Sequence, residues 1–174
     1  ANRILLISDD NVYPIYGDEV KRTITEAGFS VTEYVIPHGE EHKNWMTLAK
    51  ILEKAAECGL TREDLVVTLG GGVIGDIGGF AAAVYMRGID FIQIPTTLLS
   101  AVDASVGGKT AIDLEHGKNL AGAFWQPALV LCDCDTLRTL PKEQFENGMA
   151  EVIKYGFISD ESILEMVEQD LNET

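Results

Sequence analysis

Short runs of apolar, often β-branched residues alternate along the chain with longer stretches in which apolar residues recur every three or four positions. The short runs predict strands over residues 3–8, 31–36, 65–69, 91–95 and 129–133. The longer stretches predict helices over residues 13–29, 45–58, 73–86 and 98–105. Strands that alternate with helices are typical of an α/β domain, so we expect a doubly wound, mostly parallel sheet with helices on both faces.

This rhythm changes twice toward the end of the chain. Residues 106–124 contain glycines, lysines and short strand-like pieces, and a loop of that length inside a compact domain is usually functional. From residue 144 the apolar residues follow helical spacing again. We expect residues 1–142 to form the α/β domain, and residues 143–174 to be the first helices of a helical second domain that this chain leaves incomplete.

Charge and cysteine content limit the possible partners and the compartment. The formal net charge of −15 argues against a nucleic-acid backbone or an anionic membrane as partner. No apolar run is long enough for a transmembrane helix. Three cysteines without a CxxC pair fit unpaired thiols in a reducing cytosol, so we expect a cytoplasmic protein. Cys132 and Cys134 lie two apart in a strand-like run, which predicts small core residues.

A glycine-rich turn follows the third predicted strand. Gly70, Gly72 and Gly75 match the GxGxxG pattern between a strand and a helix. Glycines let the backbone approach a pyrophosphate, and a helix N-terminus directs free N–H groups at it. The turn therefore predicts a Rossmann-like dinucleotide site, and a tight turn without a ligand is the alternative. The next strand ends without an acidic residue for the ribose, so acidic groups after the first two strands would have to hold it.

Four cations lie beside glycines or polar turn residues in this acidic chain: Arg87, Lys109, Lys118 and Lys154. The segment 103–110 resembles a phosphate-binding loop, although its glycine spacing is not that of a Walker A motif. Solvated surface lysines are the alternative reading for each cation alone. Their position near predicted strand ends favours an anion pocket.

The chain resembles the 3-dehydroquinate synthase family in a set of short segments that follow the family's order and spacing over nearly the whole chain. The segments are Gly39–Lys43, Gly70–Asp76, Gly79–Ala82, Arg87-Gly88, Pro95–Leu99, Asp103–Thr110, Gly117–Leu120, Leu137–Pro141 and Gly148–Gly156. The resemblance implies a carbon–oxygen lyase that converts 3-deoxy-D-arabino-heptulosonate 7-phosphate to 3-dehydroquinate and phosphate, in the shikimate pathway of aromatic amino acid biosynthesis. It also implies NAD as a regenerated cofactor and a divalent metal, zinc or cobalt, as Lewis acid.

The family's functional positions map onto residues of this chain. Those that would bind NAD are Asp9, Asn11, Glu40, Lys43, Gly71, Gly72, Val73, Asp76, Thr96, Thr97, Leu99, Lys118, Thr136, Leu137 and Thr139. Those that would contact the substrate are Asp103, Lys109, Asn119 and Lys154. Arg87 matches an arginine that reaches the substrate phosphate from a neighbouring subunit, which implies a homodimer. Glu151 matches a metal ligand; an exposed helix residue paired with Lys154 is the alternative.

The chain departs from the family pattern in the metal site. The family uses two further histidines, which this sequence does not contain, and His38, His42 and His116 match no ligand position. A catalytic zinc normally has three protein ligands, so we expect this polypeptide alone to bind no catalytic metal and to be inactive. Ala104 and Asp113 replace a serine and an asparagine that are common in the family.

Three other functions remain open from the sequence. Another sugar phosphate cyclase, such as 2-deoxy-scyllo-inosose synthase, shares the glycine turn, the basic loop and the metal glutamate. A polyol dehydrogenase of the glycerol type shares the fold and a glycine-rich turn. The third alternative is an NAD-binding module without catalysis.

Overall fold

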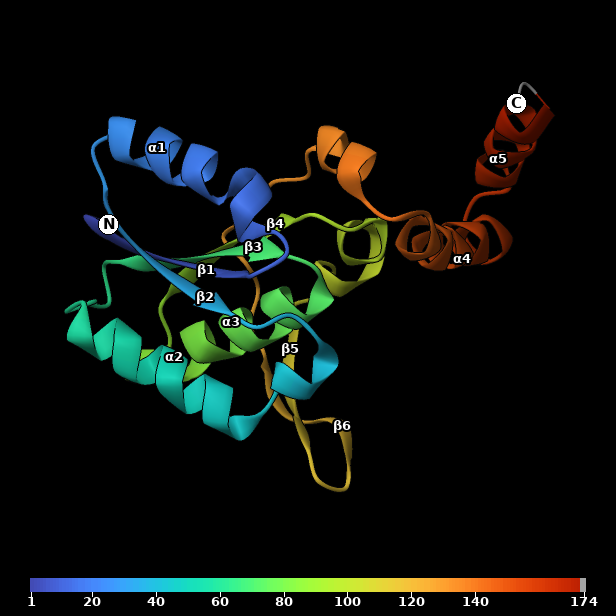
Figure 1. The fold of residues 1–174 in the computed structure, drawn as a ribbon. Helices are drawn as coiled ribbons and strands as arrows, with labels where there is room; N and C mark the ends of the chain where they lie inside the picture. The colour runs from blue at the N-terminus through green and yellow to red at the C-terminus, as the bar shows by residue number, and fades with distance from the viewer. Residues whose placement is uncertain (173–174) are drawn as a thin grey trace.

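The computed structural model describes the backbone of residues 1–172 and the side chains of residues 1–169 (Figure 1). Its main sheet has the strand order β2-β1-β3-β4-β7, and every neighbouring pair is parallel. These strands are β1 (Arg3–Asp9), β2 (Ser30–Ile36), β3 (Leu65–Gly70), β4 (Asp90–Pro95) and β7 (Leu129–Val130). The predicted doubly wound parallel sheet is confirmed.

Helices cover both faces of this sheet (Figure 1). Helix α1 (Asp18–Glu26) packs on one face, where Leu6 and Val67 are buried beside its residues Val20 and Ile24. Helices α2 (Trp45–Glu57) and α3 (Gly72–Val84) pack on the other face. Successive strand residues point to opposite faces, so one strand supplies both cores: Ile4 and Leu6 enter the first, and Leu5 and Ile7 the second.

The strand order reverses between β1 and β3. The chain crosses from β1 to β2 on one side and returns past β1 to β3 on the other, with α1 and α2 on opposite faces of the sheet. Ligands of open α/β sheets bind at such a switch point, outside the carboxyl ends of the strands. This edge of the sheet is therefore where a site is expected.

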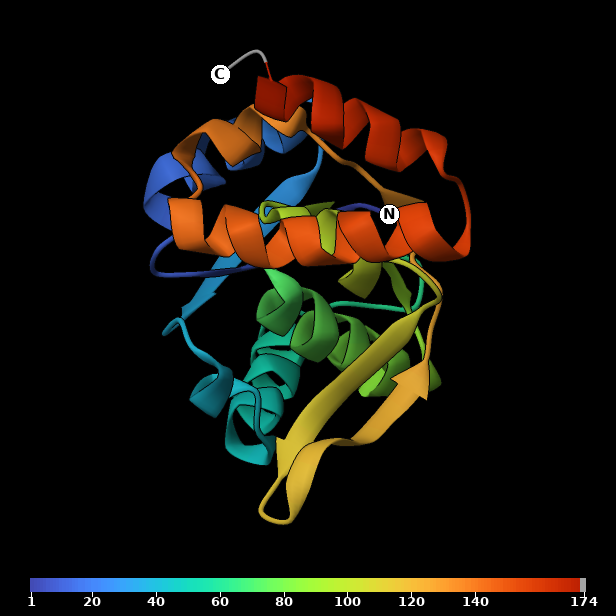
Figure 2. The ribbon, with the colours of Figure 1, turned by 90° about the vertical axis from the view of Figure 1, so that its right-hand side faces the viewer.

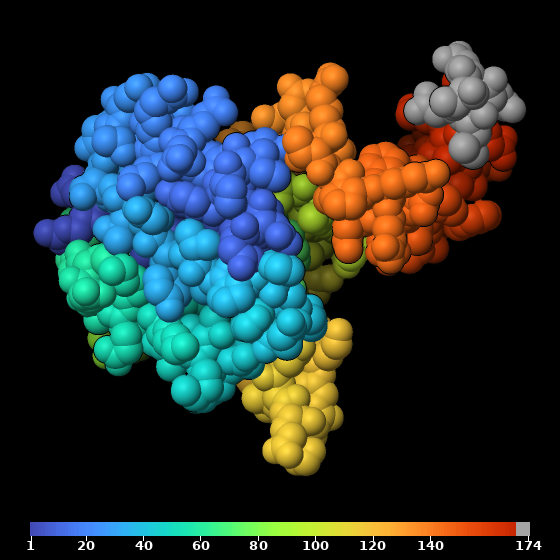
Figure 3. Space-filling model, in the orientation of Figure 1, coloured from blue at the N-terminus to red at the C-terminus, as the bar shows by residue number. Residues whose placement is uncertain are grey.

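A separate antiparallel hairpin packs against α3. It consists of β5 (Lys109–Leu114) and β6 (Gly117–Phe124). Ile112 of β5 is fully buried in the core that α2 and α3 share. The distal part of the hairpin projects from the body of the domain (Figures 1 and 3).

The last two helices lie beyond the carboxyl edge of the sheet (Figures 1 and 2). After a short helix η5 (Cys134–Thr139), α4 (Lys142–Ile158) packs against η4 (Ser100–Ala104) and leads to α5 (Ser162–Asn172). Gly148 lets α4 approach closely, because a Cβ there would lie 2.6 Å from Leu98 Cβ. Assignment of residues 143–174 to a second domain stays a prediction, and its residues 173–174 lie outside the described residues. No described helix is long and apolar enough to span a membrane.

Several predicted elements differ in extent. The helix predicted over 13–29 is a π-helical turn η1 (Tyr13–Gly17) followed by α1. The helix predicted over 98–105 is the π-helical turn η4. The strand predicted over 129–133 ends at Val130, because the chain leaves the sheet and enters η5. The expectation that Cys132 and Cys134 are core residues is wrong, since both are exposed.

Asp64 fastens the amino end of β1 to the turn before β3. Its Oδ1 accepts the N–H groups of Asn2 and Arg3, and its Oδ2 accepts the N–H and the hydroxyl of Thr61, all at 2.9 Å. Burial by itself raises the pKa of this carboxyl, but the hydrogen bonds to its charged form outweigh burial and keep the pKa well below its usual range.

The Asp64→Asn variant is expected to lose about 2–3 kcal/mol of unfolding free energy at pH 7, because the amide keeps one acceptor oxygen for four donors. Since the folded-state pKa is lowered, the carboxylate stabilises the protein above the unfolded pKa of about 3.9 and loses this effect as pH falls through the folded pKa. Urea unfolding from pH 7 to pH 2 should show the two proteins converging at low pH. Asp90→Asn, at an exposed position without a side-chain partner among the described residues, is the control. Equal stability at pH 7 would contradict the assignment.

Candidate functional site

The glycine turn lies at the switch point of the sheet. Strand β3 ends at Gly70, Gly71 caps α3 in an extended conformation, and α3 begins at Gly72. The first N–H to bond back along this turn is that of Gly75, to Gly71 O at 3.1 Å. The amides of Gly72 and Val73 have no partner within the helix, and no side chain caps them. The turn therefore offers free donors and the positive end of a helix dipole to an anion.

The turn is closed on one side by the segment after β4. A Cβ at Gly71 would lie 3.2 Å from the Thr97 methyl, so a side chain there would fill this narrow space. Thr96 N–H donates to Gly70 O at 3.0 Å, and the two strand ends are thereby joined. Among the described residues, Thr96 Oγ1 is the buried side-chain oxygen that lacks a hydrogen-bond partner. Such an orphaned group costs free energy unless a ligand or water satisfies it.

Ser100 holds Thr97 in place, a role that the sequence pattern did not indicate. Its hydroxyl lies 2.8 Å from Thr97 Oγ1 and accepts the Thr97 N–H at 3.2 Å, while the Ser100 N–H donates back to Thr97 Oγ1 at 3.1 Å. Ser100 is fully buried. Only its position three residues after a Thr-Thr pair could have indicated this reciprocal bonding.

The other predicted cofactor residues lie along the same edge. Asp9 is the last residue of β1, and its Oδ1 accepts the N–H groups of Asn11 and Val12 at 2.9 Å each. On the far side of this loop, the Tyr16 hydroxyl lies 2.5 Å from Thr139 Oγ1 and donates to Thr136 O at 3.3 Å. The structure thus brings the β1 end and η5 together, although the Asp9 oxygen is already used to form the turn.

Lys43 connects the glycine-turn helix to the hairpin. Although it is a lysine, it is only 3% exposed. Its Nζ donates to Asn119 Oδ1 at 2.8 Å and lies 3.0 Å from Glu40 Oε1 and 3.1 Å from Asp76 Oδ2. Asp113 Oδ1 is 3.7 Å away. We call these five residues the Lys43 cluster.

Burial and neighbouring charges act in opposite directions on the pKa values of Lys43 and Asp76. Burial by itself lowers the pKa of Lys43, but the nearby Asp76 and Glu40 carboxylates outweigh it and raise the pKa above its ordinary value. Burial raises the pKa of Asp76, and Lys43 offsets this only in part. The lysine is therefore a firmly charged group on which the surrounding carboxylates depend.

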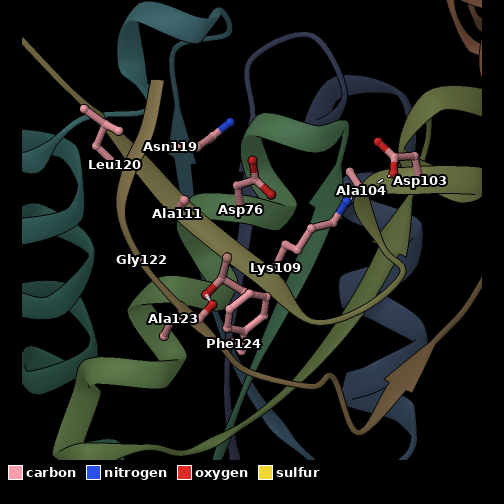
Figure 4. Close-up of a pocket in the computed structure, with 11 residues that line it drawn as sticks. Asp76, Asp103, Ala104, Lys109, Ala111, Asn119, Leu120, Gly122, Ala123 and Phe124 are labelled. Carbon is pink, nitrogen blue, oxygen red and sulfur yellow. Dashed lines mark hydrogen bonds and ion pairs between the residues drawn. The ribbon is translucent and has the colours of Figure 1, made fainter. Parts of the chain in front are cut away.

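A pocket of ≈ 480 Å³ opens between α3, η4 and the hairpin (Figure 4). Asp76 and Asn119 belong to its wall, and so do Asp103 and Lys109. Lys109 Nζ lies 3.1 Å from Asp103 Oδ1, and Figure 4 shows this side chain reaching from β5 toward η4. Lys154 of α4 forms an ion pair with Glu151, and the charge of Asp103 also acts on it. Lys109 is thus paired with Asp103 in the pocket wall, whereas Lys154 is paired with Glu151 on α4.

The four predicted cations do not share one pocket within a single chain. Lys118 lies at the hairpin turn and is 3.4 Å from Glu40 Oε1. Arg87 precedes β4, at the opposite edge of the sheet from the glycine turn, and its side chain has no partner among the described residues. Met86, Arg87 and Gly88 all have positive φ, at 49°, 70° and 119°. A strained turn therefore presents an exposed, unpaired guanidinium away from this chain's own pocket.

The described residues do not form a metal site by themselves. No group of three or more His, Cys, Asp or Glu side chains in this part of the chain is arranged to hold a metal ion. Glu151 forms an ion pair with Lys154, as expected if this position is a helix residue paired with the lysine rather than a metal ligand. One carboxylate does not satisfy the three-ligand requirement of a catalytic zinc.

Comparisons with known proteins agree with this geometry. A family model described as 3-dehydroquinate synthase N-terminal matches residues 33–147. A 3-dehydroquinate synthase from Pelobacter propionicus is 52% identical over 170 residues, which are 98% of this chain and 47% of that protein. The chain spans about half the length of the curated relatives it matches.

Solved structures with the same fold include two sugar phosphate cyclases. A 2-epi-5-epi-valiolone synthase from Streptomyces hygroscopicus, with NAD⁺ and Zn²⁺ bound, has a TM-score of 0.90 and 30% identity, over 96% of this chain and 47% of that one. A 2-deoxy-scyllo-inosose synthase, complexed with carbaglucose-6-phosphate, NAD⁺ and Co²⁺, has a TM-score of 0.84 and 33% identity, over 88% of this chain and 42% of that one.

Proposed function

Because the chain belongs to the 3-dehydroquinate synthase family, we propose that it forms the NAD-binding part of an enzyme that converts 3-deoxy-D-arabino-heptulosonate 7-phosphate to 3-dehydroquinate and phosphate. The observation that carries the proposal is the pair of free amides at Gly72 and Val73, placed at the switch point of the sheet beside the pocket. The identity of about half the residues to curated synthases, over nearly the whole chain, supports this substrate over others.

The chain's own residues fit a dinucleotide. The free amides after Gly71 would receive the pyrophosphate, and the unsatisfied Thr96 hydroxyl would gain a partner from the bound cofactor. Glu40 and Lys43 would lie toward the adenosine end, since they follow the neighbouring strand β2. The remaining predicted contacts are Asp9, Asn11, Val73, Asp76, Thr97, Leu99, Lys118, Thr136, Leu137 and Thr139. When bound, NAD would oxidise a substrate hydroxyl and later return the hydride.

The pocket mouth fits an anionic substrate. Lys109 forms an ion pair with Asp103, and Lys154 forms one with Glu151. Because these ion pairs already hold the two side chains, a phosphate or carboxylate group of the substrate could bind the ammonium groups without first ordering them. Asn119 would add an amide to the same wall. Arg87 lies at the opposite edge of the sheet and does not line this pocket, and we propose that it reaches the site of a second copy in a homodimer. A complete protein that sediments as a monomer would contradict this.

Glu151 would supply one ligand to a zinc or cobalt site whose other ligands lie outside the 174 residues. A metal there would act as a Lewis acid on substrate hydroxyls.

The free thiols of Cys58, Cys132 and Cys134 support a cytoplasmic location, where they would stay reduced.

Turnover and metal content test this proposal together. The complete protein, supplied with NAD and zinc, is expected to release phosphate from heptulosonate 7-phosphate without accumulating NADH. The 174-residue chain is expected to bind no zinc after dialysis and to release no phosphate, because it supplies one ligand of the three required. Stoichiometric NADH from the complete protein would indicate a polyol dehydrogenase instead. Bound zinc or turnover in the 174-residue chain would contradict the incomplete metal site.

A second sugar phosphate cyclase activity is the alternative that the structural likeness favours. The 2-deoxy-scyllo-inosose synthase shares 33% of the aligned residues and the same fold. Parallel assays with glucose 6-phosphate and heptulosonate 7-phosphate separate the two, and preference for glucose 6-phosphate would replace the proposed substrate.

A further inference from the structure

Asp113 lies at an irregularity in the hairpin that faces the Lys43 cluster. The pairing of β5 with β6 shifts register between Ile112 and Leu114, so Asp113 has no partner across the ladder. Bulges of this kind redirect a side chain and are common beside binding sites. The Asp113 side chain is only 19% exposed although it belongs to a projecting hairpin.

Asp113 contacts the neighbouring segments at three points. Its N–H donates to Lys43 O at 2.8 Å, and its Oδ1 lies 3.7 Å from Lys43 Nζ. The same Oδ1 accepts the Asn119 N–H at 2.8 Å. The residue therefore joins the two ends of the hairpin turn to each other and to the segment before α2.

The bond to Asn119 holds its backbone in an uncommon conformation. Asn119 has φ = 57°, in the left-handed region that non-glycine residues rarely occupy. Such a residue persists where its surroundings over-determine it. In this conformation the Asn119 side-chain oxygen accepts a hydrogen bond from the Lys43 ammonium group. Lys43 also donates to Asp76 on the opposite wall of the pocket.

We infer that Asp113 is a positioning residue, which holds Asn119 and, through it, Lys43 and Asp76 in the arrangement that the pocket needs for a dinucleotide and a phosphorylated substrate. The inference rests on the proposed function for its ligands. Its physical content is one hydrogen bond from the Asn119 N–H to the Asp113 carboxylate. A neutral side chain of the same shape keeps that bond.

The test compares three variants of the complete protein. Asp113→Ala removes the acceptor, Asp113→Asn keeps an acceptor oxygen but removes the charge, and Glu115→Ala is a control at an exposed position of the same turn. Asp113→Ala is expected to raise KM for NAD and for substrate about tenfold each, the effect of losing one hydrogen bond and leaving its donor unpaired, with little change in kcat. Asp113→Asn and Glu115→Ala are expected to resemble the wild type.

Amide hydrogen exchange reports on the hydrogen bond between Asn119 and Asp113 and does not depend on enzyme activity. The Asn119 N–H is expected to exchange about tenfold faster in Asp113→Ala than in the wild type and at the wild-type rate in Asp113→Asn. Unchanged exchange and KM in Asp113→Ala would overturn the inference. So would an Asp113→Asn variant as impaired as Asp113→Ala, because the charge rather than the bond would then matter. A wild type that neither binds NAD nor turns over would refute the proposed function alone, since exchange would still report on Asp113.

Discussion

The Lys43→Met variant is expected to unfold with about 3 kcal/mol less free energy than the wild type and to bind NAD at least about tenfold more weakly. Methionine keeps the apolar stem of the lysine and removes the ammonium group. Glu40, Asp76 and Asp113 would then face one another, and the cations that remain near them, Lys118 beside Glu40 and Lys109 in the same pocket as Asp76, are both exposed. An exposed ion pair contributes under about 1 kcal/mol, but an uncompensated buried charge costs several.

Burial decides between these two magnitudes, because the Lys43 side chain is 4% exposed and that of Asp76 18%. The pKa of Lys43 is raised in the folded state, so its stabilisation is complete below the unfolded pKa of about 10.4 and is lost as pH rises through the folded pKa. The full effect is therefore expected at pH 7, where urea unfolding and NADH fluorescence titration would measure it.

Two further variants separate charge from packing at this position. Adding Asp76→Asn to Lys43→Met removes one of the stranded carboxylates and is expected to recover part of the lost stability. Lys50→Met replaces an exposed lysine on α2, the helix that follows Lys43, and is expected to change the free energy of unfolding by less than about 0.5 kcal/mol. A Lys43→Met protein as stable as Lys50→Met would show that the Lys43 cluster does not hold the two walls together.

The Gly78→Ala variant is expected to be less stable by about 1–3 kcal/mol and to bind NAD more weakly. Helix propensity alone predicts the opposite, because alanine is favoured over glycine inside a helix by about 0.5–1 kcal/mol. Packing is expected to win, since a Cβ at Gly78 would overlap the Thr68 methyl and lie 3.5 Å from Ile7 Cδ1. Helix α3 would have to move off the sheet, and the free amides at its start would move with it.

A compensating substitution makes this prediction specific. Thr68→Ser deletes the methyl group that the new Cβ would overlap, so the Gly78→Ala/Thr68→Ser double variant is expected to recover most of the stability that Gly78→Ala loses. Thermal unfolding of all four proteins gives the coupling free energy. Additive effects of the two substitutions would contradict the close approach of α3 to β3.

Local sequence determined the fold class and the glycine-rich turn of this protein. The apolar runs mark each strand of the main sheet because a doubly covered parallel strand is apolar along its length. Gly70 to Gly75 indicates the strand-to-helix turn because the lack of a Cβ, which permits the close approaches seen there, is a property of each residue alone. Helix ends were less predictable, since the first helix begins as the π-helical turn η1, continues into α1 and ends at Glu26.

Only the tertiary structure decided which polar residues act together. Lys43, Asp76 and Asn119 are far apart in the sequence, yet they form one hydrogen-bonded cluster, because the hairpin folds back over α3. Asp113 and Ser100 have no periodicity or motif of their own, so their contacts arise from the bulge and from the turn after β4. Spacing along a chain fixes the spacing within one helix or strand, whereas partners across elements depend on how those elements pack.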